Sequence, residues 1–233
     1  MEKAVKMKAL ELIVDWALWP RYEANELDST NVSRMKEALR AGIELPPIVA
    51  DAKSFRIIDG VHRQKAYLAV YGEGAEIEVI LRKYKNDGEM YLDAARLNTI
   101  QGLPLSPKDK VHVILVGRRM KLPLAKIAEA LGMRKEKAND LLEKRTATTS
   151  KGEKIPLAAG AIRLAGKHLN KNQEKFARTS NGMQPIVNAR LLLNALKANS
   201  FPLTDKELDI YIELRDELTD KINHAVEARK AVA

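Results

Sequence analysis

Hydrophobic positions along the chain change their spacing near residue 87. Before it, short apolar runs at Ile48–Ala50, Phe55–Ile58 and Ala75–Leu81 predict strands, and an amphipathic segment from Val61 to Tyr71 predicts a helix. After it, apolar residues recur at helical spacing to the end of the chain. The pattern predicts an α+β chain, with a small mixed α/β module followed by helices.

Helix boundaries are clearest in the second half of the chain. In Ser106-Pro107-Lys108-Asp109, the serine is a good N-cap, the proline suits the first helical position, and the acid lies at N3. A second helix begins after Pro123 and ends at Gly132, and a third follows from Arg134 to about Arg145. The small polar residues 146–152 indicate a linker. We therefore expect three parts, covering residues 1–86, 87–146 and 155–233.

The two short helices around Gly132 are typical of a helix-turn-helix. The start of the second would present Arg134, Lys135 and Lys137 where a recognition helix meets the major groove. Residues 118–145 hold nine Lys and Arg against four acids, a net charge of +5. The pattern predicts binding of double-stranded DNA, and an ordinary helical hairpin with a solvated basic face is the alternative. The candidate DNA contacts are Arg118, Arg119, Lys126, Arg134, Lys135 and Lys137.

A second candidate site is the turn that separates the strand ending at Ile58 from the following helix. Asp59-Gly60 forms the turn, and His62 and Arg63 lie in the first helical turn. Cations there oppose the helix dipole, whereas a bound anion would be stabilised by it and by the backbone N–H groups. The prediction is a phosphate site. Its alternative is a solvent-exposed first turn with Arg63 paired to an acid.

Composition narrows the function classes. The 233 residues carry a net charge of +9 with a pI near 9.6, which favours polyanionic partners. The chain has no cysteine, which excludes disulfides, thiolate metal sites and cysteine nucleophiles. Its four histidines lack ligand spacing, so no metal site is predicted. No apolar run is long enough for a membrane span and no signal-peptide core follows the N-terminus, so we expect a cytoplasmic protein with no membrane partner.

The order of these parts resembles the ParB family of partition proteins, a ParB/sulfiredoxin fold followed by a helix-turn-helix, over residues 8–145. Residues 57–66 fall where the family has its phosphate-contacting Gly-Glu-Arg-Arg motif. Pro20-Arg21 and Pro46-Pro47-Ile48-Val49 resemble two further family segments. Asn98 falls where the family has a Glu-Asn pair that helps to hold Mg²⁺. Residues 98–106 are closer still to ParB-like proteins of phages and transcriptional regulators.

The resemblance implies a sequence-specific DNA-binding protein that acts in DNA partition or transcriptional regulation. It also implies control by CTP or another nucleotide, a homodimer, and a partner ATPase. Carried over by position, the nucleotide-binding candidates are Arg21, Gly60, His62, Arg63 and Asn98.

Departures from the family pattern bear on catalysis. Val61 and Leu97 stand where the family has glutamates, which argues against Mg²⁺-dependent CTP hydrolysis. Asp59 lies at the same turn and is the residue that could compensate for the loss of these glutamates. Sulfiredoxin activity is excluded because its cysteine has no counterpart. The alternative function is a nuclease or nucleotide-dependent enzyme with Asp59, His62 and Arg63 as its catalytic candidates.

A third hypothesis is that the chain is an interaction protein that acts mainly through its C-terminal helices. Residues 203–228 carry apolar side chains close to helical spacing. Such a stripe is typical of a core-facing helix and also of a dimerisation surface. The members of the stripe are Leu203, Leu208, Tyr211, Ile212, Leu214, Leu218, Ile222 and Ala225.

Overall fold

The computed structural model describes residues 3–22, 29–100 and 104–179, and scattered helical residues between 190 and 226. The chain divides into two compact units, residues 1–183 and 184–233. In the second unit the longest described run is the helical segment 211–216. Of the C-terminal apolar stripe, Leu203, Leu208 and Ala225 lie outside the described residues. None of the described helices is long and apolar enough to cross a membrane.

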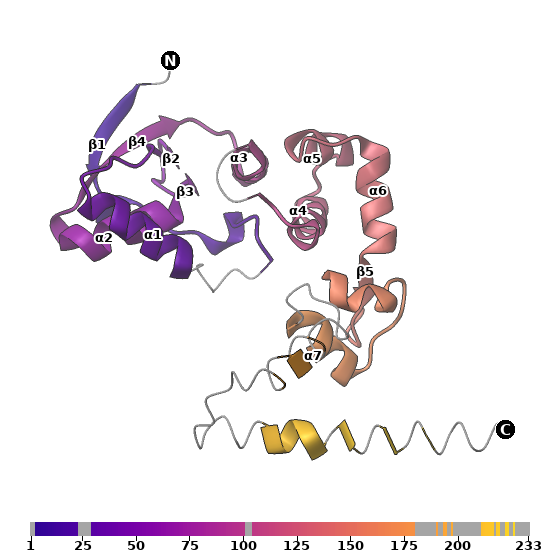
Figure 1. Cartoon of the computed structure of the whole chain (residues 1–233). Coiled ribbons are helices and arrows are strands. Elements are labelled where there is room, and N and C mark those ends of the chain that lie inside the picture. Colours follow the sequence, from indigo (N-terminus) through magenta and orange to yellow (C-terminus); the bar gives the residue numbers. More distant parts are fainter. Residues whose placement is uncertain are drawn as a thin grey trace. The chain divides into compact units, whose positions relative to one another are not determined.

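A four-stranded sheet with the order β1-β4-β2-β3 forms the start of the first unit. The strands are β1 (Ala4–Lys8), β2 (Ile48–Asp51), β3 (Ile57–Asp59) and β4 (Glu76–Arg82). The β2–β4 pair is parallel and the other two pairs are antiparallel. Helices α1 (Ser29–Arg40) and α2 (Val61–Tyr71) pack against each other beside this sheet (Figure 1). The predicted fold class, a mixed α/β module followed by helices, is confirmed.

The module's core lies between the sheet and α2. Ile48, Ala50, Ile57 and Val79 are buried there, which explains the apolar runs that predicted β2, β3 and β4. Helix α2 is anchored by the buried Gln64, whose Nε2 donates to the carbonyl oxygens of Ala9 (2.8 Å) and Leu12 (2.9 Å). The anchoring fixes where the N-terminus of α2 lies.

Four helices build the next part of the first unit around one core. They are α3 (Asp87–Ile100), α4 (Pro107–Arg119), α5 (Leu124–Ala130) and α6 (Lys135–Lys144). Tyr91, Ile114, Ile127 and Leu131 are fully buried in that core. The predicted capping box of α4 is present, with Ser106 and Asp109 bonding to each other's backbone N–H groups. The helix boundaries predicted from Pro107, Pro123 and Gly132 are confirmed.

The expectation of a linker at residues 146–152 is wrong. Strand β5 (Thr146–Thr148) pairs antiparallel with β6 (Lys154–Pro156), in a region that had been predicted to be helical beyond residue 155. A 3-10 helix, η4 (Ala159–Leu164), and helix α7 (Lys171–Thr179) follow. Ala147, Ile155 and Leu157 are buried together in a small core of their own. Small and β-branched residues can therefore form a strand here because its pairing and burial come from residues further along the chain.

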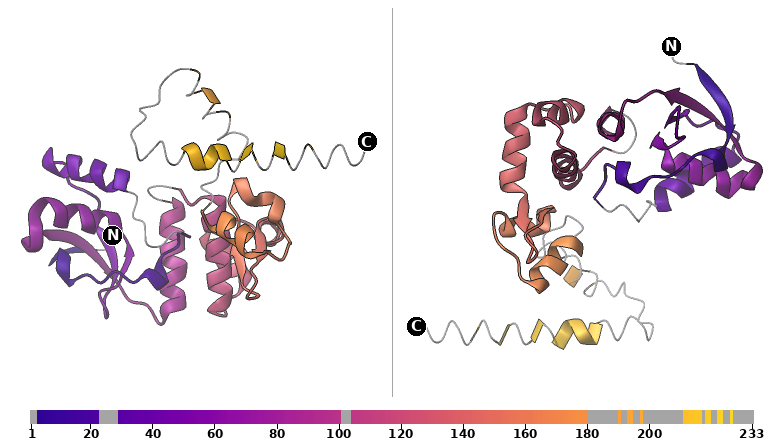
Figure 2. Two further views of the ribbon diagram at one scale, coloured as in Figure 1. Left: turned by 90° about the horizontal axis from the view of Figure 1, so that it is seen from below. Right: turned by 180° about the vertical axis from the view of Figure 1, so that it is seen from behind.

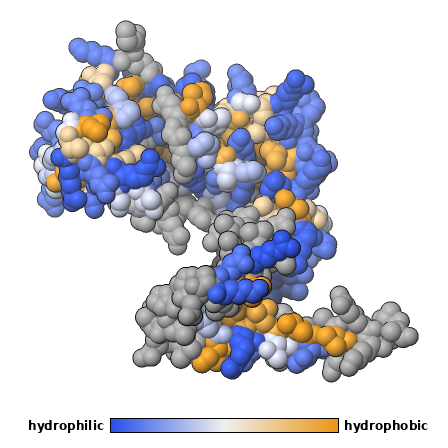
Figure 3. All heavy atoms as spheres, viewed as in Figure 1, coloured by the Kyte–Doolittle hydropathy of each residue, from blue (hydrophilic) through white to orange (hydrophobic). Residues whose placement is uncertain are grey.

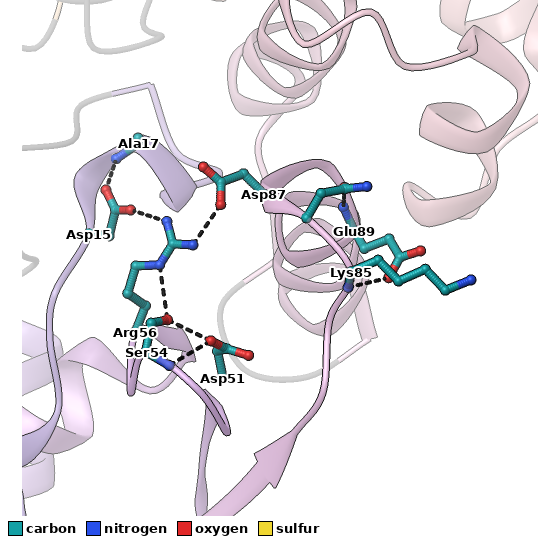
Figure 4. A network of polar contacts seen from close by, with 9 residues as sticks. Asp15, Ala17, Asp51, Ser54, Arg56, Lys85, Asp87 and Glu89 are labelled. Carbon is teal, nitrogen blue, oxygen red and sulfur yellow. Dashed lines mark hydrogen bonds and ion pairs between the residues drawn. The ribbon is translucent and has the colours of Figure 1, made fainter.

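Arg56 joins three elements of the first unit (Figure 4). Its guanidinium contacts Asp15 (2.9 Å), before the 3-10 helix η2 (Trp16–Leu18), and Asp87 (2.6 Å), at the start of α3. Its Nε donates to Ser54 Oγ (3.2 Å). Hydrogen bonds to Asp87 and then Asp15 raise the pKa of Arg56. The network ties the loop that carries Trp19 and Arg21 to the sheet and to α3.

Candidate functional site

The turn between β3 and α2 has the geometry that an anion site needs. Gly60 is the N-cap of α2 with φ +117°, and no side chain of the described residues caps the helix. A Cβ at Gly60 would lie 2.8 Å from Ile48 Cγ1, so both the backbone conformation and the packing require glycine. The first turn of α2 contains no acidic residue, whereas Ser106 and Asp109 cap the N-terminus of α4. The N-terminus of α2 is thus left for an external acceptor.

Arg63 is held within the protein by its own partners. It is 9% exposed, and its Nη1 donates to the carbonyl oxygens of Pro46 (2.9 Å) and Pro47 (2.6 Å). Its Nη2 pairs with Asp59. These bonds fasten the turn to the segment that enters β2. We therefore assign Arg63 a positioning role at this turn.

A cavity of about 180 Å³ opens beside the turn. It brings together residues from the loop after η2, from α1, from the Asp59–Arg63 turn and from the end of α3. Arg21 Nη2 donates to Asn98 Oδ1 (3.4 Å), across 77 positions of sequence. All five residues predicted to bind a nucleotide line this cavity, together with Asp59. These residues are Arg21, Gly60, His62, Arg63 and Asn98.

Trp19 also lines the cavity, and sequence reasoning missed it. Its side chain is 9% exposed, and its ring lies 5.7 Å from that of His62. Its Nε1–H is buried and meets no acceptor in the described part of the chain. A buried donor without an acceptor is costly. The signal in the sequence was only a tryptophan next to the Pro20-Arg21 pair.

The cavity loop is fastened to the helical part through one carboxylate. Asp109, the N3 residue of α4, accepts from the backbone N–H of Tyr22 (3.0 Å) and lies 3.9 Å from Arg21 Nη1. Its Oδ2, the oxygen near Arg21, also accepts from the backbone N–H and the hydroxyl of Ser106. The residue that caps α4 therefore also positions the arginine of the cavity.

Val61 and Leu97, which replace the family's two glutamates, are both 5% exposed and packed in hydrophobic cores. In this chain those positions contribute packing. Within the described residues, no group of three His, Cys, Asp or Glu side chains could hold a metal ion.

The α5–α6 pair forms the second candidate site. Met133 N–H donates to Ala128 O (3.0 Å) and Gly132 N–H to Glu129 O (2.9 Å), with Gly132 at φ +61°. This Schellman motif ends α5 and directs the chain into α6. The small side chains of Ala128 and Ala138 are only 1% and 0% exposed, so the two helices approach closely.

Every cation predicted to contact DNA is exposed: Arg118, Arg119, Lys126, Arg134, Lys135 and Lys137. Figure 3 shows hydrophilic side chains along the outer side of α6. Asn139, which sequence reasoning missed, is exposed one turn after Lys135. Asparagine suits adenine recognition because its amide offers both a donor and an acceptor.

No family model and no curated protein matches this chain. The solved structures to which it is similar include three of ParB proteins. A pNOB8-like ParB N-domain has a TM-score of 0.39 and is 15% identical in sequence. The match covers 70% of this chain and 59% of the other chain, so this chain spans less than two thirds of that chain's length. Caulobacter crescentus ParB complexed to the centromeric parS site has a TM-score of 0.42 and 13% identity, covering 59% and 69%.

The third structure is the Caulobacter crescentus protein complexed with CTP-gamma-S, with a TM-score of 0.35 and 12% identity, covering 60% of this chain and 76% of that one. All three belong to the family that the sequence resembles. Similarity at this level transfers no function to this chain.

Proposed function

We propose that this chain is a ParB-type DNA-binding protein in which the α5–α6 pair acts as a helix-turn-helix and the cavity at Gly60 binds a nucleotide. The observation that carries the proposal is the cavity. It gathers the five residues that the family resemblance predicts to bind a nucleotide, beside the N-terminus of α2, which no side chain of the described residues caps. Asp109 then connects the cavity arginine, Arg21, to the helix that precedes the α5–α6 pair.

The cavity suits the phosphate part of the ligand. Its volume of about 180 Å³ is below the range of roughly 300–1,000 Å³ for sites that enclose a whole drug-sized ligand. Arg21 and the backbone N–H groups at the start of α2 are donors around it. We therefore expect phosphate recognition to dominate, with the base and sugar contributing less. CTP is the first nucleotide to test.

Calorimetric titration with CTP, inorganic pyrophosphate and cytidine tests the cavity. We expect CTP and pyrophosphate to bind and cytidine, which has no phosphate, to bind far more weakly. Arg21→Gln should weaken CTP binding about tenfold or more, since a charge-assisted hydrogen bond contributes roughly 1.5–3 kcal/mol. Arg40→Gln, an exposed arginine of α1, is the control and should bind as the wild type does. Equal binding by the Arg21 variant would contradict the proposal.

DNA binding is tested by fluorescence anisotropy with a labelled duplex. Affinity should fall steeply between about 50 and 200 mM salt, because bound cations release counterions from the phosphates. A flat salt dependence would contradict a DNA-binding role. The same samples test the enzyme alternative: DNA cleavage or nucleotide hydrolysis that is lost in a folded Arg63→Ala variant would show that the activity depends on the turn that Arg63 holds.

Mapping of bound DNA across the genome, with and without CTP, separates the two cellular roles. Spreading from a site would support partition, in which a partner ATPase is expected, and one bound palindrome near an operon would support transcriptional regulation. We also expect a homodimer, since helix-turn-helix proteins commonly bind paired half-sites. Light scattering that shows a monomer with and without DNA would remove that expectation.

A further inference from the structure

The positive charge of this protein is concentrated both on the α5–α6 pair and in the segment that follows it in the sequence. Residues 146–179 carry seven Lys and Arg against two acids, a net charge of +5. Together with residues 118–145 they carry +10, whereas the whole chain carries +9. The remaining 171 residues therefore have a net charge of −1. A segment that holds the entire charge excess is where a polyanion would bind.

The basic residues of 146–179 lie on a folded element, which we call the β5–α7 module. All seven are exposed: Lys151, Lys154, Arg163, Lys167, Lys171, Lys175 and Arg178. Beneath them, Ala147, Ile155 and Leu157 form part of the module's core. Segment 166–169 is bonded along β5, with Thr148 N–H donating to Lys167 O (2.9 Å) and Leu169 N–H to Thr148 O (2.8 Å). Lys167 is thereby fixed beside the β5–β6 hairpin.

Contacts attach this module directly to the helices of the candidate DNA site. Strand β6 packs on α4. Strand β5 follows α6 with a single residue between them, and Figure 2 shows the chain running from α6 directly into this module. Arg119 contacts Glu153 (3.4 Å), in the loop between the two strands. Leu157 N–H donates to Arg145 O (2.8 Å), at the end of α6. The module cannot move independently of α4 and α6 without breaking these contacts.

A polar groove of about 430 Å³ runs between α6 and the module. Arg118, Asn139 and Glu143 line it from the helical side, and Thr146, Thr148 and Lys154 from the module side. Glu143 is the acidic residue among them. Two of these, Arg118 and Asn139, belong to the surface that we propose for DNA. A recognition helix in the major groove, about 12 Å wide, has a phosphate backbone on each side. The groove therefore lies where a backbone strand would pass an inserted α6.

We propose that the β5–α7 module is a second DNA-contacting element, which binds the phosphate backbone next to the site of α6 through Lys151, Lys154 and Lys167. The inference rests on the proposed DNA binding and adds a contact surface outside the helix-turn-helix. The module contributes affinity and register, while the side chains of α6 read the bases. The partner is duplex DNA because the groove is shared with α6.

Three triple variants, each lowering the net charge by three, test the module. The module variant replaces Lys151, Lys154 and Lys167 with glutamine. The α6 variant replaces Arg134, Lys135 and Lys137 with glutamine at the start of that helix. The matched control replaces three exposed lysines of the N-terminal module, Lys3, Lys8 and Lys53, with glutamine. Each is titrated against a fluorescein-labelled random-sequence duplex at several KCl concentrations, after circular dichroism shows that it is folded.

For the module variant we expect binding at least about tenfold weaker at low salt, and a slope of log K against log salt smaller by two to three, as loss of that many phosphate contacts requires. The control should change the slope by less than about one. A module variant that matches the control, while the α6 variant is weakened, would overturn this inference and leave the proposed function standing. A wild-type protein that binds no duplex would overturn both.

Discussion

Two tyrosines show how differently the same residue is accommodated in this chain. Tyr91 is fully buried among the helices, and its hydroxyl meets no partner within the described residues. Burial raises its pKa. Tyr84 donates to Asp93 Oδ2 (2.7 Å), which also accepts from Arg82 (2.7 Å). One hydroxyl is an unsatisfied donor in the core, and the other completes a polar network.

Replacing each tyrosine with phenylalanine should therefore give opposite results. Tyr91→Phe removes a buried hydroxyl that makes no hydrogen bond, so the free energy of unfolding should stay the same or rise by up to about 1 kcal/mol. Tyr84→Phe should lower it by about 1–2 kcal/mol because Asp93 loses a donor. Urea unfolding of the two variants measures both. A clear loss of stability in Tyr91→Phe would show that its hydroxyl has a partner after all.

At this scale, sequence reasoning located the cavity residues better than their roles. Gly60 was identifiable because a turn before a helix requires its backbone freedom locally. Arg63 was predicted to face phosphate, yet it holds the carbonyl oxygens of Pro46 and Pro47, which no local pattern reveals. The pairing of Arg21 with Asn98 depends on tertiary packing. The family resemblance predicts only that both residues belong to the nucleotide site.

Among the elements, two turns of the helical part share one hydrogen-bond pattern but differ in residue. Leu122 N–H donates to Gly117 O (2.9 Å) and Lys121 N–H to Arg118 O (3.0 Å), as in the turn at Gly132. Lys121 has φ +61°, the same value as Gly132. A residue with a Cβ is strained in this conformation by roughly 1 kcal/mol, and glycine is not.

Lys121→Gly should therefore raise the free energy of unfolding, by up to about 1 kcal/mol. Gly132→Ala is the matched opposite. An added Cβ there has room, the nearest atom being 3.7 Å away at Thr99, so its expected loss of about 1 kcal/mol reports the backbone strain alone. Thermal and urea unfolding measure both. Destabilisation by Lys121→Gly would mean that the lysine side chain contributes more than its conformation costs.

Elements with local signals were predicted, and elements that depend on distant pairing were not. Helix α4 has a capping serine and a proline at its start, and α2, α5 and α6 are bounded by glycines or a proline, namely Gly60, Gly72, Pro123 and Gly132. Strand β1 pairs with β4, about 70 positions away, and its sequence Ala-Val-Lys-Met-Lys lacks a decisive pattern. Strand β5 was taken for a linker because its residues are small and polar. The basic module behind α6 was missed for that reason.

Across the first unit, one histidine couples stability to pH at a junction between distant segments. His112 of α4 packs edge-to-face on Tyr22, whose backbone N–H is bonded to Asp109. Burial, then the positive charge of Arg119, lowers the pKa of His112 to about 4, although Asp109 acts in the opposite direction. The folded chain therefore resists protonation of a residue that the unfolded chain protonates near pH 6.5.

Stability should accordingly fall as pH decreases from 6.5 towards 4, because the unfolded state binds the additional proton in that window. At pH 5 the loss from this residue amounts to about 2 kcal/mol relative to pH 7.5. Urea unfolding of the wild type and of His112→Phe at both pH values isolates the effect, since the carboxylates titrate in both proteins. The variant should lose less stability on acidification than the wild type. Equal losses in the two proteins would show that His112 titrates normally in the folded chain, and the contact with Tyr22 would then be open to water.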